Sequence, residues 1–164
     1  MIGLLVVLYV LFFDLSRIVS PSMSPTLKGT SIDNGDRILT EKITYRFRRP
    51  RRFEVITFLN NDGIRVMKRV IGLPGETVQQ EGNGPLLIDG EPIEMPPTVD
   101  QKYLRYGNLA DGKPVLCGDG YYVLGDYTRD SDDSRFNGPV APHRIIGRAW
   151  LIVSPWSRSG WVNP

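Results

Sequence analysis

The sequence predicts a mostly β fold built from antiparallel sheets. Its 164 residues include 17 glycines and 13 prolines, which are spread along the chain and separate many short apolar runs. Strands are bounded by such turn residues, whereas helices need longer stretches in which apolar residues recur every three or four positions. No long stretch of that kind follows the N-terminus. The length suits one domain with a hydrophobic core.

Short runs rich in β-branched residues mark the expected strands. The clearest pair, residues 54–59 and 64–71, is separated by Asn60-Asn61-Asp62-Gly63, which is typical of a hairpin turn. The other expected strands are residues 37–39 continued by 43–45 as one strand or hairpin arm, residues 121–124 and residues 145–153.

Residues 77–114 differ from the rest of the chain in composition. They are polar and rich in glycine and proline, with a short hairpin expected around Asp89-Gly90. We expect this segment to be an excursion from the main sheet that contributes few buried side chains.

The N-terminal segment is apolar and is expected to be a helix. Residues 1–13 carry no charge. A helix that continues through Val19 approaches the length that spans a bilayer, with Asp14 as a costly member. We therefore expect residues 1–19 to form a single-pass anchor in the lipid bilayer, followed by a β domain of residues 20–164. One alternative is a buried core helix. The other is a cleaved signal peptide, which the lack of a basic leader and of an Ala-x-Ala site disfavours.

Charge and cysteine content exclude several classes of function. A net charge of +2 is too small to indicate a nucleic-acid partner. The single cysteine, Cys117, excludes an intramolecular disulfide and a multi-cysteine metal site. We expect no metal and no other cofactor.

Five arginines surround Pro50. Surfaces that bind nucleic acid usually interleave such charges with stacking aromatic side chains, and only Tyr45, Phe47 and Phe53 are interleaved here. Two interpretations remain, a solvated hairpin tip and a surface attracted to anionic lipid. The arginine cluster consists of Arg46, Arg48, Arg49, Arg51 and Arg52.

Ser22 and Lys68 are the strongest candidates for catalysis. Ser22 lies in Pro21-Ser22-Met23-Ser24-Pro25, a turn that its prolines stiffen just after the apolar segment. A hydroxyl beside a neutral lysine can serve as nucleophile and general base without histidine. The chemistry requires a lysine whose pKa is lowered, which burial among apolar side chains provides.

The strand over residues 64–71 predicts such surroundings for Lys68. Side chains alternate between the two faces of a strand, so Lys68 shares its face with three aliphatic residues. Arg65 and Arg69 lie on the opposite face, which we therefore expect to be the solvated one. The alternative is that Lys68 extends its amine to the edge of the sheet and stays charged.

His143 and the acidic loop of residues 126–135 are weaker candidates. His143, the only histidine, would have to serve any Ser–His–acid triad, but it stands between a proline and an arginine and is expected in an exposed loop. Gly-x-Ser-x-Gly and Ser-x-x-Lys motifs are absent from the sequence. The acidic loop lacks the glycine and glutamate that an EF-hand needs, so we expect hydrogen bonds within the loop rather than a bound metal.

Five short motifs follow one another along nearly the whole chain. They are Pro21–Leu27, residues 35–39, residues 53–58, residues 67–76 and Gly125–Arg135. In this order they resemble the boxes of type I signal peptidases, which are membrane-bound serine proteases of the Ser/Lys class. The first is similar to the nucleophile box, the fourth matches the lysine box, and the fifth resembles the final Gly-Asp-Asn…Ser-x-Asp-Ser-Arg box. The resemblance implies a signal-peptidase-like or LexA-like β core.

The resemblance also implies a role for each site residue. It implies Ser22 as the nucleophile, Lys68 as the general base and Ser131 as the residue that orients the lysine amine. The Ser22 backbone N–H and the Ser20 hydroxyl are implied as the oxyanion hole. Structural support is implied for Asp126, Asp133, Ser134 and Arg135, with Asp133 and Arg135 as an ion pair.

Three positions depart from the family pattern. Tyr127 and Thr128 stand where the family usually has Asn and Arg, and Pro21 replaces a common Gly. These departures concern the contacts that support the loop and leave the Ser/Lys pair intact.

The implied function is removal of N-terminal signal peptides from exported preproteins at the extracytoplasmic face of a membrane. In this family, shallow apolar pockets admit small residues, typically alanine, before the scissile bond. Two alternatives remain open. One is a soluble, self-cleaving Ser/Lys protease, a family with a related core that lacks this apolar N-terminus and the final box. The other is a catalytically inactive, membrane-tethered β domain that binds peptides.

Overall fold

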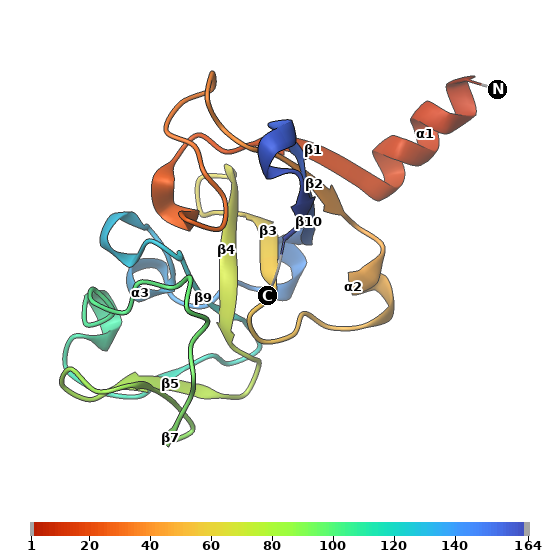
Figure 1. Ribbon diagram of the computed structural model, residues 1–164. Helices are drawn as coiled ribbons and strands as arrows, with labels where there is room; N and C mark the ends of the chain where they lie inside the picture. The colour runs from red at the N-terminus through yellow and green to blue at the C-terminus, as the bar shows by residue number, and fades with distance from the viewer. Residues whose placement is uncertain (1, 163–164) are drawn as a thin grey trace.

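Two antiparallel β-sheets make up most of the structure, a computed structural model that describes residues 2–162 (Figure 1). The larger sheet has the strand order β1-β2-β10-β3-β4-β9, with β11 paired to β10. The smaller sheet has the order β7-β6-β5-β8 and lies below the larger one in Figure 1. The predicted mostly β, antiparallel fold is confirmed.

The strands of the larger sheet come from both halves of the chain. They are β1 (Phe13–Arg17), β2 (Arg37–Glu41), β3 (Val55–Leu59), β4 (Arg65–Gly72), β9 (Tyr122–Leu124), β10 (Ile145–Ser154) and β11 (Gly160–Trp161). The smaller sheet consists of β5 (Thr77–Gln80), β6 (Leu86–Ile88), β7 (Glu91–Pro92) and β8 (Val115–Leu116).

The helices are short apart from the first. The α-helices are α1 (Ile2–Phe12), α2 (Thr44–Phe47) and α3 (Ser134–Asn137). Single 3-10 turns are η1 (Pro21–Met23), η2 (Gly107–Leu109), η3 (Thr128–Asp130), η4 (Pro142–Arg144) and η5 (Trp156–Arg158).

The hairpin of β3 and β4 forms as predicted. The two strands are antiparallel, and Ile56 lies opposite Lys68. The Asn60 side chain closes the turn by accepting from the backbone N–H groups of Asp62 and Ile64, at 3.0 and 2.8 Å. Gly63 has a φ of 75°, which favours glycine because it has no Cβ.

The prediction of a strand at residues 43–45 is wrong. Residues 44–47 form α2, so β2 ends at Glu41. The cause is local: the Glu41 carboxylate accepts from the backbone N–H groups of Ile43 and Thr44, both at 2.9 Å. A side chain that bonds the backbone just ahead of it favours a turn over a continuing strand.

The N-terminal helix ends earlier than expected. Residues 13–17 form β1, which pairs along its length with β2, so the helix does not extend to residue 19. Asp14 lies opposite Thr40 in this pairing and forms an ion pair with Arg65 at 3.0 Å. Helix α1 extends away from the β-sheets (Figure 1). Within residues 2–162, no helix has both the length and the apolar character to cross a membrane.

Residues 77–114 have a core of their own, so the expectation of few buried side chains there is wrong. Buried apolar residues come from β5 and β6 and from the segment between β7 and β8. Those residues pack together with Tyr122 and Leu124 of β9, which joins the two sheets. The buried members from this segment are Val78, Leu86, Ile88, Met95, Val99, Leu104 and Leu109.

Leu86→Ala is expected to lower the free energy of unfolding by about 2–5 kcal/mol, because it leaves a cavity in this second core. Leu86 is fully buried, whereas its neighbour Leu87 faces the other way and is half-buried. Urea unfolding measures the loss, with Leu87→Ala as the matched control. A larger loss in the control would contradict the assignment of this core.

Candidate active site

Ser22 is held on a short turn whose flanks are anchored in the core. It lies in η1, which begins at Pro21, and its side chain is buried. Met23 and Leu27, just after it, belong to a buried apolar cluster that includes Met67 of β4. These contacts fix the direction in which the Ser22 hydroxyl points.

Lys68 reaches this hydroxyl from β4. Its side chain is only 4% exposed, so the predicted burial of Lys68 is confirmed. The amine Nζ donates to Ser22 Oγ at 2.7 Å. No rearrangement is therefore needed for proton exchange between the two groups.

Burial lowers the pKa of Lys68 to about 8, since desolvation disfavours the charged amine. The carboxylates of Asp133, Asp132 and Asp126 act in the opposite direction, while Arg135 adds to the lowering. A large fraction of the amine is thus neutral in mildly alkaline solution and available to accept a proton.

Arg69 lies on the face of β4 opposite Lys68. We expected this face to be solvated, but at Arg69 it is buried. The Arg69 side chain is 1% exposed. Its Nε and Nη2 donate to the two carboxylate oxygens of Asp126, both at 2.7 Å, and Nη1 donates to the Phe53 carbonyl at 2.7 Å. Only Arg65, near the hairpin turn, is exposed as predicted.

Asp126 connects β4 to the turn that carries Ser22. Its side chain is fully buried and also accepts from the Thr26 hydroxyl. The next residue, Tyr127, donates its backbone N–H to the Ser22 carbonyl at 3.0 Å. One loop thereby braces both partners of the Ser22–Lys68 pair.

Gly125 permits this close approach. A Cβ at this position would lie 2.2 Å from Ser131 Oγ and 2.5 Å from the Ser22 carbonyl oxygen. Because neither group can retreat without moving the site, glycine is required here.

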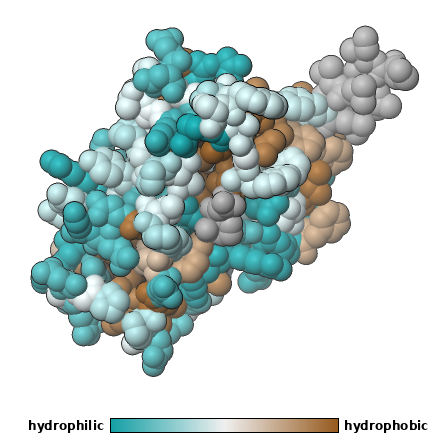
Figure 2. Space-filling view, viewed as in Figure 1, coloured by the Kyte–Doolittle hydropathy of each residue, from teal (hydrophilic) through white to brown (hydrophobic). Residues whose placement is uncertain are grey.

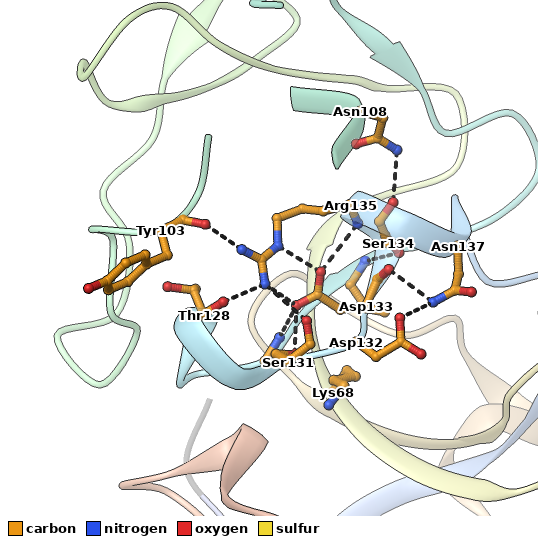
Figure 3. A network of polar contacts seen from close by, with 12 residues as sticks. Lys68, Tyr103, Asn108, Thr128, Ser131, Asp132, Asp133, Ser134, Arg135 and Asn137 are labelled. Atoms are coloured by element: carbon orange, nitrogen blue, oxygen red, sulfur yellow. Dashed lines mark hydrogen bonds and ion pairs between the residues drawn. The ribbon is translucent and has the colours of Figure 1, made fainter. Parts of the chain in front are cut away.

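Asp133 is the centre of a second buried network (Figure 3). It accepts from Arg135 Nε at 2.8 Å and Nη2 at 2.9 Å, from the Ser131 hydroxyl at 2.7 Å and from the Gly125 backbone N–H at 3.0 Å. The expected ion pair between Asp133 and Arg135 is confirmed. Ser134 adds a further link, because its hydroxyl accepts from the Val123 backbone N–H at 2.9 Å.

Ser131 contacts Asp133 rather than Lys68. Within the described chain, its hydroxyl donates to the carboxylate, and the Lys68 amine donates to Ser22 alone. Ser131 is buried, and Figure 3 shows its side chain near that of Lys68. Its orienting role therefore stays a prediction.

Tyr127 and Thr128, the two departures from the family pattern in this loop, both contribute backbone contacts. The Thr128 carbonyl accepts from Arg135 Nη2 at 2.7 Å, and Tyr127 contributes its N–H as described above. Thr128 also donates its hydroxyl to the Asp100 carbonyl at 2.5 Å. Tyr127 thus supports the loop through its backbone, whereas Thr128 supports it through both its carbonyl and its hydroxyl.

Comparison with known proteins places the chain in a family. Residues 1–156 match the family model described as "Signal peptidase, peptidase S26". The chain belongs to this signal peptidase family. It is 38% identical to the signal peptidase I of Leptolyngbya laminosa, over 90% of this chain and 71% of that protein. It is 33% identical to the probable signal peptidase I-1 of Synechocystis sp., over 99% of this chain and 83% of that protein.

A solved structure is also similar. The signal peptidase I of Enterococcus faecalis is 31% identical, with a TM-score of 0.48, over 62% of this chain and 97% of that one.

Two cavities adjoin the Ser22–Lys68 pair, and Ser20, Ser22 and Lys68 line both. One has a volume of about 300 Å³ and includes Phe58 and Val140. The other has a volume of about 440 Å³, and its lining includes apolar residues that follow β1, together with Met67 of β4. The hydroxyl of Ser20 lies 3.1 Å from that of Ser22.

His143 lies elsewhere, exposed on η4 as the sequence predicted. Among residues 2–162, no hydrogen bond joins it to Ser22. The same residues contain no group of three or more His, Cys, Asp or Glu side chains that could hold a metal ion.

Arg69 and Thr26 are the site residues that the sequence analysis missed. The signal for Arg69 was present, because its strand face also carries Met67 and Ile71, which are both buried. An arginine between two apolar side chains indicates a buried ion pair as readily as a solvated face.

Arg69→Met is expected to lower the free energy of unfolding by about 3–5 kcal/mol, because it leaves the Asp126 carboxylate buried without its charge partner. The control is Arg65→Met on the same strand, which removes a surface ion pair with Asp14 and is expected to cost about 0–1 kcal/mol. Urea unfolding measures both. Equal losses would mean that Asp126 does not depend on Arg69.

Proposed function

We propose that this protein is a signal peptidase, a serine endopeptidase that removes N-terminal signal peptides from exported preproteins through Ser22 and Lys68. The observation that carries the proposal is the 2.7 Å contact between a buried lysine amine and a serine hydroxyl. Membership of the signal peptidase family supports the substrate class.

The proposed reaction is acyl transfer in two stages. Lys68 takes the proton from Ser22 as its oxygen attacks the scissile carbonyl, and the ammonium then protonates the leaving amine. The signal peptide remains as an ester on Ser22. Lys68 next takes a proton from water, which attacks the ester, and the proton returns to Ser22 as the peptide leaves.

The Ser20 hydroxyl and the Ser22 backbone N–H are the proposed donors to the tetrahedral oxygen. Ser20 is close enough to serve, with its oxygen 3.1 Å from that of Ser22. Removal of one such donor typically raises the barrier by about 3–4 kcal/mol.

Ser131 and Asp133 are proposed to stabilise the lysine when it is protonated. The Ser131 hydroxyl donates its proton to Asp133, so its lone pairs stay free to accept from the Lys68 ammonium. The charge on Asp133 favours that ammonium, and Arg135 limits the effect.

The two cavities are proposed to accept alternate side chains of an extended substrate that crosses the Ser22–Lys68 pair. Side chains on an extended strand point to opposite sides in turn, so neighbouring side chains of the substrate would enter different cavities. Each cavity has room for a side chain, and the family resemblance implies small residues before the scissile bond.

Within the N-terminal segment of residues 1–19, helix α1 (Ile2–Phe12) is proposed as the membrane anchor, because residues 13–17 belong to the larger sheet. The β domain is proposed to lie on the extracytoplasmic side. In support, side chains of α1 that contact no core are apolar and exposed, as Val7, Val10 and Leu11 illustrate. A site just after this segment would meet substrates as they leave the same bilayer.

Ser22→Ala and Lys68→Ala are each expected to reduce cleavage of a detergent-solubilised preprotein at least about 10³-fold, because nucleophile and base act as one unit. His143→Ala is the control and is expected to cleave at the normal rate. Product bands on a gel measure the rate. Full activity of Lys68→Ala would contradict the mechanism, and retained binding without cleavage by the unaltered protein would favour the inactive peptide-binding domain.

The rate constant kcat/KM is expected to rise with pH and level off above about 8, because only the neutral Lys68 amine accepts the Ser22 proton. Asp132→Asn is expected to move this rise to lower pH, since the Asp132 charge raises the pKa of Lys68. Asp130→Asn is the control, because Asp130 lines the same cavity and is also exposed. A shift to higher pH in Asp132→Asn would contradict the role of Lys68 as base.

A further inference from the structure

The five arginines around Pro50 divide into two groups according to their partners. Arg48 pairs with Glu54 at 2.5 Å and Arg52 with Glu76 at 2.6 Å, so these two belong to the fold. The other three, Arg46, Arg49 and Arg51, are exposed and form no ion pair with any residue between positions 2 and 162.

Arg46 and Arg49 border a hollow of about 550 Å³ that is separate from the Ser22–Lys68 site. Tyr45, Phe47 and Arg48 also line it, as do Pro74, Tyr121 and Pro142 from other parts of the chain. Asp119 is the one acidic residue among those that line it. With Arg48 already paired to Glu54, two unpaired guanidinium groups face one carboxylate, so the hollow favours an anion.

Arg46, which borders the hollow, also contacts the apolar helix α1. Arg46 lies over the ring of Phe12, 5.6 Å from its centroid, and the Lys42 amine donates to the Val10 carbonyl at 2.9 Å. Phe47, between Arg46 and Arg48, is 84% exposed. Figure 2 shows an apolar strip along the right edge of the molecule, below the end of α1.

Basic and apolar side chains side by side are typical of a surface that lies at the boundary between lipid headgroups and acyl chains. An acidic protein surface would satisfy the arginines but would leave Phe47 and the apolar side chains of α1 exposed. A nucleic acid would need stacking platforms, and Phe47 is the only fully exposed ring in the described hollow.

We propose that this hollow binds the phosphate headgroup of an anionic phospholipid, through Arg46 and Arg49. Phe47 and the exposed side chains of α1 then lie toward the acyl chains. The bound lipid fixes the orientation of the β domain on the bilayer independently of the chemistry at Ser22.

The test compares binding of the full chain to two kinds of vesicle, one of phosphatidylcholine and one of equal parts phosphatidylcholine and phosphatidylglycerol. The ratio of the two partition coefficients cancels the apolar contribution of α1 and isolates the effect of headgroup charge. Arg46→Gln/Arg49→Gln is expected to lower this ratio by about fivefold for each arginine. Both side chains are exposed, so the fold is expected to persist, and cleavage activity in detergent serves as the check.

The matched control is Lys102→Gln/Arg105→Gln, which removes the same charge from exposed positions in the segment of the smaller sheet. This variant is expected to change the ratio less than about twofold, because these charges lie away from the apolar surface. An equal fall in both variants, or no fall in Arg46→Gln/Arg49→Gln, would overturn the proposal.

A second measurement distinguishes lipid from soluble phosphate. Inorganic phosphate at constant ionic strength is expected to leave the thermal unfolding temperature unchanged. A rise that disappears in Arg46→Gln/Arg49→Gln would assign the hollow to a soluble phosphate compound and overturn the lipid assignment. Since these measurements do not depend on peptide cleavage, they succeed or fail separately from the proposed peptidase function.

Discussion

The buried carboxylate of Asp126 is the constraint on which the geometry of the site depends. It joins Arg69 of β4 to Thr26, which follows the Ser22 turn, while the next peptide unit donates to the Ser22 carbonyl. The serine and the lysine come from distant parts of the chain and share no strand pairing. This link, together with the packing of Met23 and Leu27 in the core, holds the hydroxyl 2.7 Å from the amine.

A second feature follows from how the buried charges are paired. Asp126 and Asp133 each have an arginine as close partner, whereas Lys68 forms no ion pair within residues 2–162. Arginine stays protonated under all ordinary conditions, so it compensates these carboxylates permanently. The lysine is thus left near negative charge that is already balanced, and desolvation prevails over attraction in setting its pKa.

In the arginine cluster, too, the arginines that form ion pairs support the fold, and those without ion pairs are available to a ligand. Five arginines close together in sequence resemble one basic patch, yet Arg48 and Arg52 are occupied with Glu54 and Glu76. The remaining charge lies beside the apolar end of α1. Spatial neighbours, rather than sequence neighbours, therefore decide which charges are available to a ligand.

Local patterns were sufficient to predict much of this protein. The hairpin of β3 and β4 follows from its β-branched runs and its Asn-Asp-Gly turn, and five ordered motifs indicated both the family and the Ser22–Lys68 pair. The failures share one cause, which is contact between segments far apart in the chain. Arg69 is buried because Asp126 folds over it, residues 13–17 leave the helix because β2 offers backbone partners, and residues 77–114 have a core because β9 completes it. Alternation along a strand specifies which side chains share a face, but only the packed structure decides what covers that face.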